Sequence, residues 1–353
     1  MFNNHTTLAD IQALDAGIGG PVINEVAAQF DELGTFPADT IEGTSIQLTV
    51  IDKLPKVRFR KANQGVPRRA PEFGTKTLST AFLEDQIDID KAVLRSSRDI
   101  VRVLENRSKP HVISAMGHMA RQIWYGQKYN DPEGFAGLLE QYAANGDHEI
   151  DLGQDTNLSS AWFLCLAPEN LQLAFGRDQT LYQSDWRENI CYDKDGNPYD
   201  GLTSSLTCRV GLKLENIHAA MRIKNIGEQK IVGTGLNKYY EGGLSDDPMF
   251  KLLQKFAEVC HVKPNAIFMS PRSLEQLRAS RIPVNSSGDP VSELTYWTNI
   301  PLFSTINLVN CEEVLLEYDE KRNEKKNNSD REATGKESTP KEGVQFKKEL
   351  KDA

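Results

Sequence analysis

The side chains best suited to metal binding or nucleophilic chemistry are six histidines and five cysteines, scattered along 353 residues. His111 and His118 are seven residues apart, whereas two histidines that bind one metal on a helix are four apart. Cys260 and His261 are adjacent, so their side chains diverge. The cysteines have neither CxxC spacing nor a disulfide framework, which is typical of small buried residues in a reducing compartment. The residues are His5, His111, His118, His148, His218 and His261, with Cys165, Cys191, Cys208, Cys260 and Cys311.

An acidic turn near residue 195 invites a calcium interpretation. Asp193, Asp195 and Asn197 are spaced like the first ligands of a calcium-binding loop. Pro198 stands where that loop requires glycine, and Ser204 where it requires a bidentate glutamate. A hairpin turn is therefore the favoured interpretation.

Motifs of known enzymes are missing from the sequence. There is no phosphate-binding loop, HExxH or GxSxG, and Gly233 and Gly235 lack the surrounding dinucleotide fingerprint. We therefore predict a protein that is not an enzyme, with no catalytic residue, cofactor or metal site. A triad assembled from distant residues stays open as an alternative.

One stretch of this acidic chain has a local excess of basic residues. The formal net charge is −9, which argues against a general nucleic-acid binder. We predict that the local basic residues pair with acidic surface on another subunit, which gives specificity more than affinity. A solvated basic loop is the alternative. The candidate contact residues are Arg58, Arg60, Lys61, Arg68 and Arg69.

The stretch 45–91 that carries these residues is predicted to form two long strands joined by a basic tip. Apolar and polar residues alternate over 45–50 and 56–60, and apolar residues recur over 78–89, so each strand has an apolar face. The segment 63–75 holds two glycines and two prolines and is too long for a tight turn. A two-stranded ribbon is at best marginally stable by itself in water. A second copy of the chain is therefore expected to cover its apolar face, including Phe82.

The first 44 residues are predicted to form an arm with two short helices. Thr6 or Thr7 caps the first, which runs to about Asp15, and Pro21 opens the second. Two short helices separated by glycines cannot form a core. Val22 and Phe30, on the apolar face of the second helix, are therefore predicted to contact another subunit.

The rest of the chain is predicted to hold a long helix, a β-rich region and an α/β region. Helical spacing over 93–104 is interrupted near 106–110, and a second helix with one apolar stripe runs from Ser108 and Pro110 to about Gly126. A short helix is expected within 132–144. Strands are predicted at 161–166, 171–175, 190–192 and 204–214, and later at 266–269 and 302–308. Asp247 and Ser270 begin the helices of the α/β region.

The C-terminal segment 318–353 mixes both signs of charge with very few apolar residues. Such a composition cannot bury enough surface to offset chain entropy, so the segment is expected to be mobile alone.

The order of these elements resembles that of the tailed-bacteriophage major capsid protein, which has the Hong-Kong-97-type fold. TIEGTSIQLTVIDKLPKVRFRKANQGV at 40–66, followed by DIDKAVL at 88–94, is similar to the extended-loop region of a podovirus-like subfamily. SSAWFLCLAPENLQLAFG at 159–176 and the stretch 192–227 resemble its peripheral-domain strands. The resemblance implies an α+β fold with an N-terminal arm at 1–44, an extended β-hairpin loop at 45–91, a spine helix and peripheral domain at 92–227, an axial domain at 228–317 and a charged tail at 318–353.

The function that this resemblance implies is structural. Copies of the chain are expected to assemble as pentamers and hexamers into an icosahedral head around double-stranded DNA, without sequence-specific contact. The expected partners are copies of itself, a separate scaffolding protein, a portal and a decoration or cement protein, with no membrane. The expected location is the virion, with assembly in the host cytoplasm. An encapsulin-type compartment and an unrelated α+β enzyme are the alternatives.

Overall fold

The computed structural model describes residues 6–8, 20–53, 55–142, 148–177, 180–232, 239–260, 263–280 and 294–315. The chain divides into two units, Met1–Glu312 and Glu313–Ala353, and the elements below belong to the first. The predicted tail at 318–353 lies outside the described residues, and so does nearly all of the predicted first arm helix.

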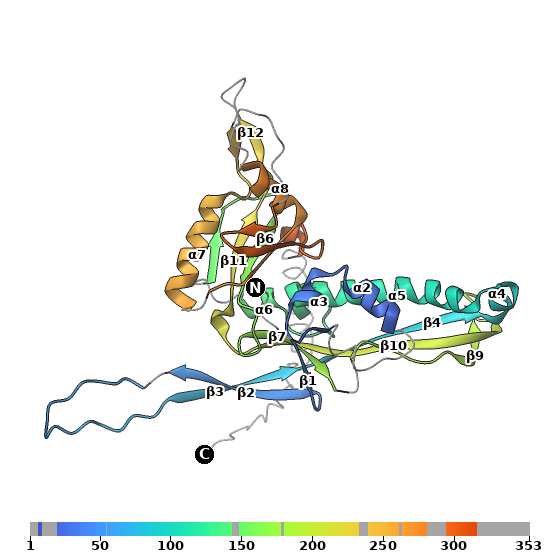
Figure 1. Cartoon of the computed structure of the whole chain (residues 1–353), viewed down its shortest axis with the longest axis horizontal. Coiled ribbons are helices and arrows are strands. Elements are labelled where there is room, and N and C mark those ends of the chain that lie inside the picture. Colours follow the sequence, from blue (N-terminus) through green and yellow to red (C-terminus); the bar gives the residue numbers. More distant parts are fainter. Residues whose placement is uncertain are drawn as a thin grey trace, which may run out of the picture. The chain divides into compact units, whose positions relative to one another are not determined.

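Two six-stranded sheets form the framework of the first unit (Figure 1). The first sheet, called the peripheral sheet below, has the order β1-β7-β10-β4, and β8 and β9 also pair with β10. Its strands are β1 Ala38–Ile41, β4 Ala81–Asp90, β7 Leu171–Gly176, β8 Tyr182–Gln183, β9 Arg187–Tyr192 and β10 Pro198–Leu214. The second sheet, called the axial sheet, has the order β15-β16-β14-β6-β11-β5. Its strands are β5 Glu149–Asp151, β6 Ser159–Leu164, β11 Ala220–Ile226, β14 Ala266–Met269, β15 Tyr296–Trp297 and β16 Ile300–Ser304.

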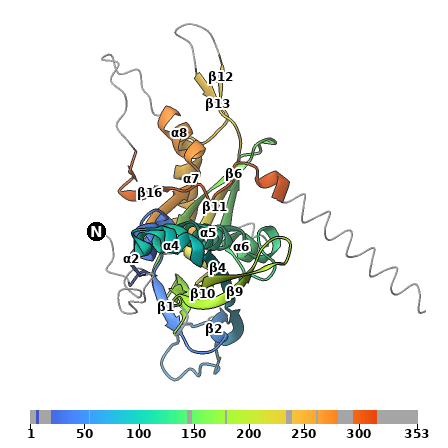
Figure 2. The same ribbon diagram turned by 90° about the vertical axis from the view of Figure 1, so that its right-hand side faces the viewer.

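Helices and two small strand pairs complete the described structure, as Figure 2 shows from a second direction. The strand pairs are β2 Ser45–Lys53 with β3 Glu72–Ser79, and β12 Lys230–Val232 with β13 Tyr239–Glu241. The helices are α2 Gly20–Ala27, α3 Asp31–Thr35, α4 Lys91–Ser96, α5 Ile100–Tyr129, α6 Leu138–Tyr142, α7 Asp246–Cys260 and α8 Pro271–Ser280, with a 3-10 turn at Ile217–Ala219.

The strands predicted between 161 and 214, the strand predicted at 266–269 and the helices of the α/β region are confirmed, and the strand predicted at 302–308 ends at Ser304. The four runs between 161 and 214 are β6, β7, β9 and β10, and the later two are β14 and β16. The axial sheet also contains β5, β6 and β11, which precede residue 228. The predicted domain limit at 227/228 therefore cuts through this sheet, because antiparallel pairing joins β6 to both β11 and β14.

The long helix α5 is continuous where the sequence predicted a break at 106–110. Asp99 caps it by accepting a hydrogen bond from the Arg102 N–H at 3.1 Å, and Pro110 lies in its interior. The expectation of two helices is wrong because α5 packs against β4 on both sides of Pro110. Arg107 donates to the Asp88 carbonyl at 3.3 Å, and the His111 ring lies 2.7 Å from the Asp85 carboxylate.

The apolar stripe of α5 reaches the axial core, as predicted. Met116, Ile123 and Trp124 are completely buried. The Trp124 ring lies 5.3 Å from Phe268 of β14 and 6.3 Å from Trp162 of β6, within the range of favourable aromatic contacts. One face of α5 is thereby fixed against the axial sheet.

The predicted ribbon proves to be shorter than expected. β2 and β3 form an antiparallel hairpin, but the return strand divides at Thr80, which donates through its N–H and its hydroxyl to the Thr44 carbonyl. β4 then pairs along its whole length with β10. Ile87 and Ile89 are buried inside the same subunit, so the expectation that a second copy covers this part of the stretch is wrong.

Candidate subunit-contact surfaces

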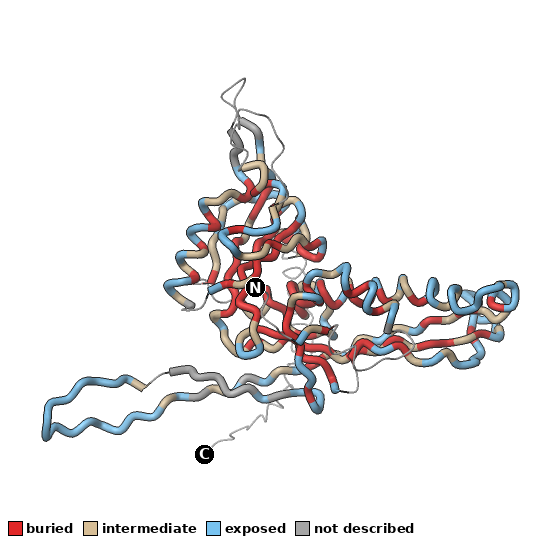
Figure 3. The backbone as a smooth tube through the Cα atoms, in the orientation of Figure 1, coloured by how far each residue is buried: buried red, intermediate tan, exposed pale blue. Residues whose placement is uncertain are grey.

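The loop that joins β2 to β3, residues 55–71, is called the ribbon tip below. Nearly all of its residues are exposed, and it contains no strand, although 56–59 were predicted to belong to one (Figure 3). The side chains of Leu48 and Val50, predicted for the apolar face of the ribbon, lie outside the described residues.

Two arginines brace the ribbon tip from within. Arg58 Nη2 donates to the Gly65 carbonyl at 3.1 Å, and Arg60 Nη1 donates to the Gln64 carbonyl at 3.2 Å. Both bonds cross the tip from one leg to the other. Each of these two guanidinium groups therefore has one N–H donor engaged within its own loop.

The residues that alternate with these arginines face solvent. Val57 is 91% exposed and Phe59 is completely exposed, the highest values among the large apolar side chains of the described residues. The tip also carries Lys56, Lys61, Arg68 and Arg69, which make no ion pair with a described residue. The tip thus presents Val57, Phe59 and the half-exposed Val66 among cations, and the described residues of its own subunit leave Val57 and Phe59 uncovered.

Strand β4 carries the opposite charge. It contains Glu84, Asp85, Asp88 and Asp90 and no basic residue. Its exposed side chains include Glu84 and Phe82, which is 56% exposed. Asp85 is paired with His111, and Asp90 caps α4 by accepting from the Ala92 N–H at 2.7 Å.

The arm helix α2 rests on α5 of the same subunit. Ile23 and Val26 are buried, while Val22 and Phe30 are half-buried. The Phe30 ring lies against α5, since a Cβ on Gly117 would be 3.7 Å from it. A subunit contact through Val22 and Phe30 stays a prediction, and it concerns only the part of each side chain that remains exposed.

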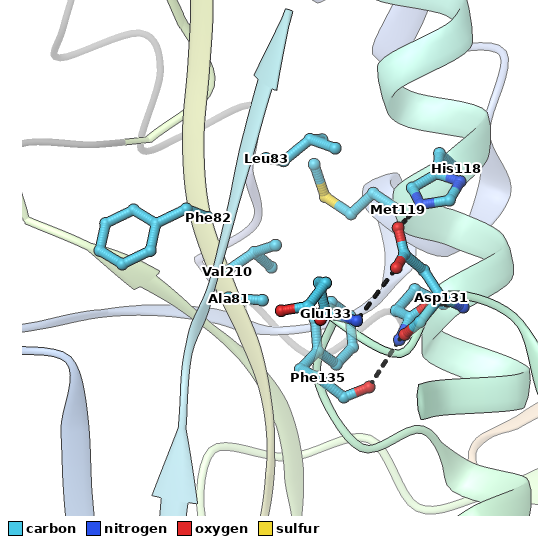
Figure 4. Close-up of a pocket in the computed structure, with 11 residues that line it drawn as sticks. Ala81, Phe82, Leu83, His118, Met119, Asp131, Glu133, Phe135 and Val210 are labelled. Atoms are coloured by element: carbon cyan, nitrogen blue, oxygen red, sulfur yellow. Dashed lines mark hydrogen bonds and ion pairs between the residues drawn. The ribbon is translucent and has the colours of Figure 1, made fainter. Parts of the chain in front are cut away.

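A small pocket lies between β4, α5 and the 131–135 segment (Figure 4). Its volume is about 50 Å³. Ala81, Leu83 and Val210 from the peripheral sheet face Met119 of α5 and Phe135 across it, whereas the Phe82 ring points away. Its floor is therefore apolar.

Polar side chains stand at the edge of this pocket. The His118 ring lies 3.0 Å from the Asp131 carboxylate, which also accepts from the Glu133 N–H at 3.0 Å. The Glu133 hydrogen bond, followed by His118, lowers the pKa of Asp131. The Glu133 carboxylate is exposed and makes no ion pair among the described residues. The pocket is thus an apolar hollow with negative charge beside it.

Two buried polar clusters fix the end of the first unit rather than forming a reactive site. Glu312 accepts from Arg222 at 2.7 Å, from Ser160 at 2.5 Å and from the Tyr125 hydroxyl at 2.9 Å. The pKa of Tyr125 is raised, first by burial and then by the charge of Glu312. The pKa of Arg222 is also raised: burial alone would lower it, but the charge of Glu312 outweighs burial. In the second cluster Glu32 accepts from Trp124, Thr305 and Asn307. The separations in sequence are too long for any local pattern to predict these pairs.

The acidic turn is the hairpin that the sequence predicted. Asp193 accepts from the backbone N–H groups of Asp195 at 2.9 Å and Asn197 at 2.7 Å, and the turn joins β9 to β10. Within the described residues, histidine, cysteine and carboxylate side chains form no cluster of three that could hold a metal ion. Cys165, Cys191 and Cys208 are buried as predicted, but Cys311 is exposed.

In the described parts of the chain, no helix has the length and apolar character needed to cross a membrane.

Comparison with known proteins supplies a family. A family model described as "Major capsid protein GP7" matches residues 34–295. No curated protein matches the chain.

Solved structures give a likeness in fold. The chain from bacteriophage Epsilon15 superposes with a TM-score of 0.53 at 17% identity, covering 77% of this chain and 86% of that one. A chain from the procapsid of bacteriophage JBD30 gives a TM-score of 0.42 at 11% identity, covering 84% and 98%. One from Mycobacterium phage Bobi gives 0.39 at 11% identity, covering 57% and 91%.

Proposed function

Because this chain belongs to the major capsid protein GP7 family and is a structural protein of the tailed-bacteriophage head, we propose that its copies assemble as pentamers and hexamers. Its fold is the α+β Hong-Kong-97-type fold predicted from the sequence, with α5 as the spine helix. The family assignment sets aside the encapsulin-type compartment and the enzyme as alternatives.

One observation supports the role of the ribbon in assembly. Within the described residues, β2 and β3 pair with each other and with no other strand, and the tip leaves Val57 and Phe59 in solvent among basic side chains. Such exposed apolar surface, next to charge, is characteristic of interaction sites. Heterologous contacts that close into rings generate pentamers and hexamers, and a projecting ribbon suits such contacts.

The finer assignments are part of the same proposal. The podovirus-like subfamily rests on the resemblance of 40–66 and 88–94 to its extended loop. The arm, loop, peripheral, axial and tail regions keep their predicted limits, except where the sheets revise them. The head is proposed to enclose double-stranded DNA without sequence-specific contact, which agrees with the acidic net charge of −9. A separate scaffolding protein, a portal and a decoration or cement protein are the proposed partners.

Electron microscopy and sedimentation of the purified full chain test the assembly. Capsomers and shell fragments are expected. The double variant Val57→Asp with Phe59→Asp is expected to lower the assembled fraction at least tenfold, because each carboxylate would have to be buried at a subunit contact. Ala62→Asp is the matched control, since it adds a carboxylate to the same exposed tip without removing an apolar side chain.

Two outcomes would contradict parts of the proposal. A wild-type chain that stays a monodisperse monomer at high concentration contradicts assembly through this ribbon. Uniform closed shells formed by the pure chain contradict the need for a scaffolding protein.

A further inference from the structure

The pocket between α5 and β4 has the size of an aliphatic side chain. Its volume is about 50 Å³, whereas a cavity that takes up benzene measures about 150 Å³. A phenyl ring is therefore too large for it, and a branched side chain of three or four carbons fits. The floor formed by Leu83, Met119 and Val210 offers such a group only apolar contacts.

The ribbon tip supplies a side chain of this kind. Val57 is a branched aliphatic residue that is 91% exposed. The side chain of the neighbouring Arg58 is restrained by its hydrogen bond to the Gly65 carbonyl. Among the described residues, only Val57 and Phe59 have a large apolar side chain more than nine-tenths exposed. Of these two, Val57 matches the volume of the pocket.

The charges on the two surfaces are opposite. The tip carries Lys56, Lys61, Arg68 and Arg69 without partners among the described residues, and it contains no carboxylate. Asp131 and Glu133 stand at the edge of the pocket. Complementary charge of this kind selects the partner and its register.

The tip cannot reach the pocket of its own chain. Ala81, which lines the pocket, follows the last residue of β3 by two positions, so the pocket is at the root of the hairpin. The tip is at the opposite end of the eight-residue strand β3. At about 3.3 Å per residue, the hairpin keeps the two about 26 Å apart. A tip residue that enters this pocket therefore comes from a second copy of the chain.

We propose that the pocket between α5 and β4 receives Val57 from the ribbon tip of a neighbouring copy. Phe59 then covers the edge of the pocket, and the unpaired cations of the tip lie beside Asp131 and Glu133. This inference rests on the proposed function, and it names the surface on which the ribbon docks.

A disulfide cross-link tests the contact directly. In a Cys311→Ser background, which removes the thiol found exposed among the described cysteine side chains, Val57→Cys and Glu133→Cys are introduced on separate chains and the chains are co-assembled. Covalent dimers are expected on non-reducing gels of capsomers or shells. The control pairs Val57→Cys with Glu258→Cys, an exposed position on α7, and should give at least tenfold less dimer.

The two possible failures are distinct. Assembled particles in which the Glu133 pair forms no more dimer than the Glu258 pair overturn the docking and leave the proposed function intact. A chain that does not assemble at all overturns the proposed function, and with it this docking.

A double-mutant cycle gives a second measurement. Ala81→Leu fills the pocket from the β4 side, and Val57→Ala removes the inserted group. Each variant is expected to raise the protein concentration needed for assembly about tenfold, because the burial of about two methyl groups at the subunit contact is lost. In the Val57→Ala background, Ala81→Leu should add little, since both changes remove the same contact. Fully additive effects, with folded subunits verified by circular dichroism, contradict the docking.

Discussion

Glu312 shows how a single side chain secures the end of the folded unit. Its carboxylate is buried with Arg222, which also lies 3.3 Å from Glu149. Arg222 also donates to Ser160 at 2.7 Å and lies over the Trp162 ring. A buried guanidinium is tolerated only when such partners compensate its lost hydration. The pair therefore ties the chain at residue 312 to the central strands of the axial sheet.

Removing this carboxylate is expected to be costly. Glu312→Ala leaves Arg222 buried with its main partner missing and should lower the free energy of unfolding by about 3–5 kcal/mol. Glu169→Gln, at an exposed position, is the control and should change it by less than about 0.5 kcal/mol. Urea denaturation of unassembled subunits measures both. Equal stability of the two variants would show that Glu312 does not carry this role.

At this scale the sequence predicted side-chain character better than side-chain partners. The burial of Cys165, Cys191 and Cys208 followed from their chemistry, whereas Cys311 was placed wrongly. Glu312 and Glu32 were missed because their partners lie up to 187 and 275 positions away. A charged residue without a nearby partner in sequence gives no sign that it is buried. The hydrogen bonds from Arg58 and Arg60 to carbonyl groups of their own loop could not be predicted either, because a count of basic residues does not show what they contact.

Among the elements, α5 and the segment that follows it are held together by a close backbone crossing. Gly126 has φ 70°, and a Cβ on it would lie 2.2 Å from the Gly137 nitrogen. The helical geometry breaks at this residue, and the Glu140 carboxylate accepts from the Gln127 N–H at 3.0 Å in place of a helical carbonyl. Only glycine can occupy both the conformation and the space.

Gly126→Ala should therefore destabilise the subunit more than its backbone conformation alone explains. Gly153→Ala is a matched control, because Gly153 has φ 65° and no atom near the site of its Cβ. Gly153→Ala should lower the free energy of unfolding by about 1 kcal/mol, because alanine disfavours the left-handed conformation. Gly126→Ala should lower it by at least about 3 kcal/mol. Thermal denaturation measures the difference. Similar costs would mean that the crossing relaxes without penalty.

The positions of most helices and strands could be predicted from the sequence, whereas the pairing of the strands could not. Short runs of strand-forming residues identified β6, β7, β10 and β14, and the stripe through Met116 and Trp124 identified α5. Pro110 suggested a break because its local cost is real, but packing against β4 outweighed that cost. The assignment of β4 to the ribbon was wrong because the pattern of apolar residues in β4 is compatible with pairing to β2 as well as to β10. Only the ten-residue register with β10 decides between them.

For the molecule as a whole, the ribbon tip is a described segment that its own subunit leaves almost uncovered. Residues 55–71 are almost entirely exposed and hold six basic residues in a loop without strands. Such a loop is a preferred site of proteolysis. In the proposed assembly the same residues are covered by a neighbour.

Limited trypsin digestion should therefore distinguish free subunits from assembled ones. Cleavage within 56–69 is expected to be at least tenfold slower in capsomers or shells than in unassembled subunits, followed by mass spectrometry. Cleavage at Arg187, an exposed residue of β9, serves as the internal comparison. Equal rates at the tip in both states would contradict its burial on assembly.

The junction at Thr80 also has a mechanical consequence. One residue separates β3 from β4, so tension applied to the hairpin passes along the backbone into a strand joined to β10 over ten consecutive residues. Antiparallel hydrogen bonds pulled along the strand direction are strained in shear, all together, and do not open one after another. In a stretched shell, tension on the hairpin would therefore be shared by the whole β4–β10 ladder of each subunit at once.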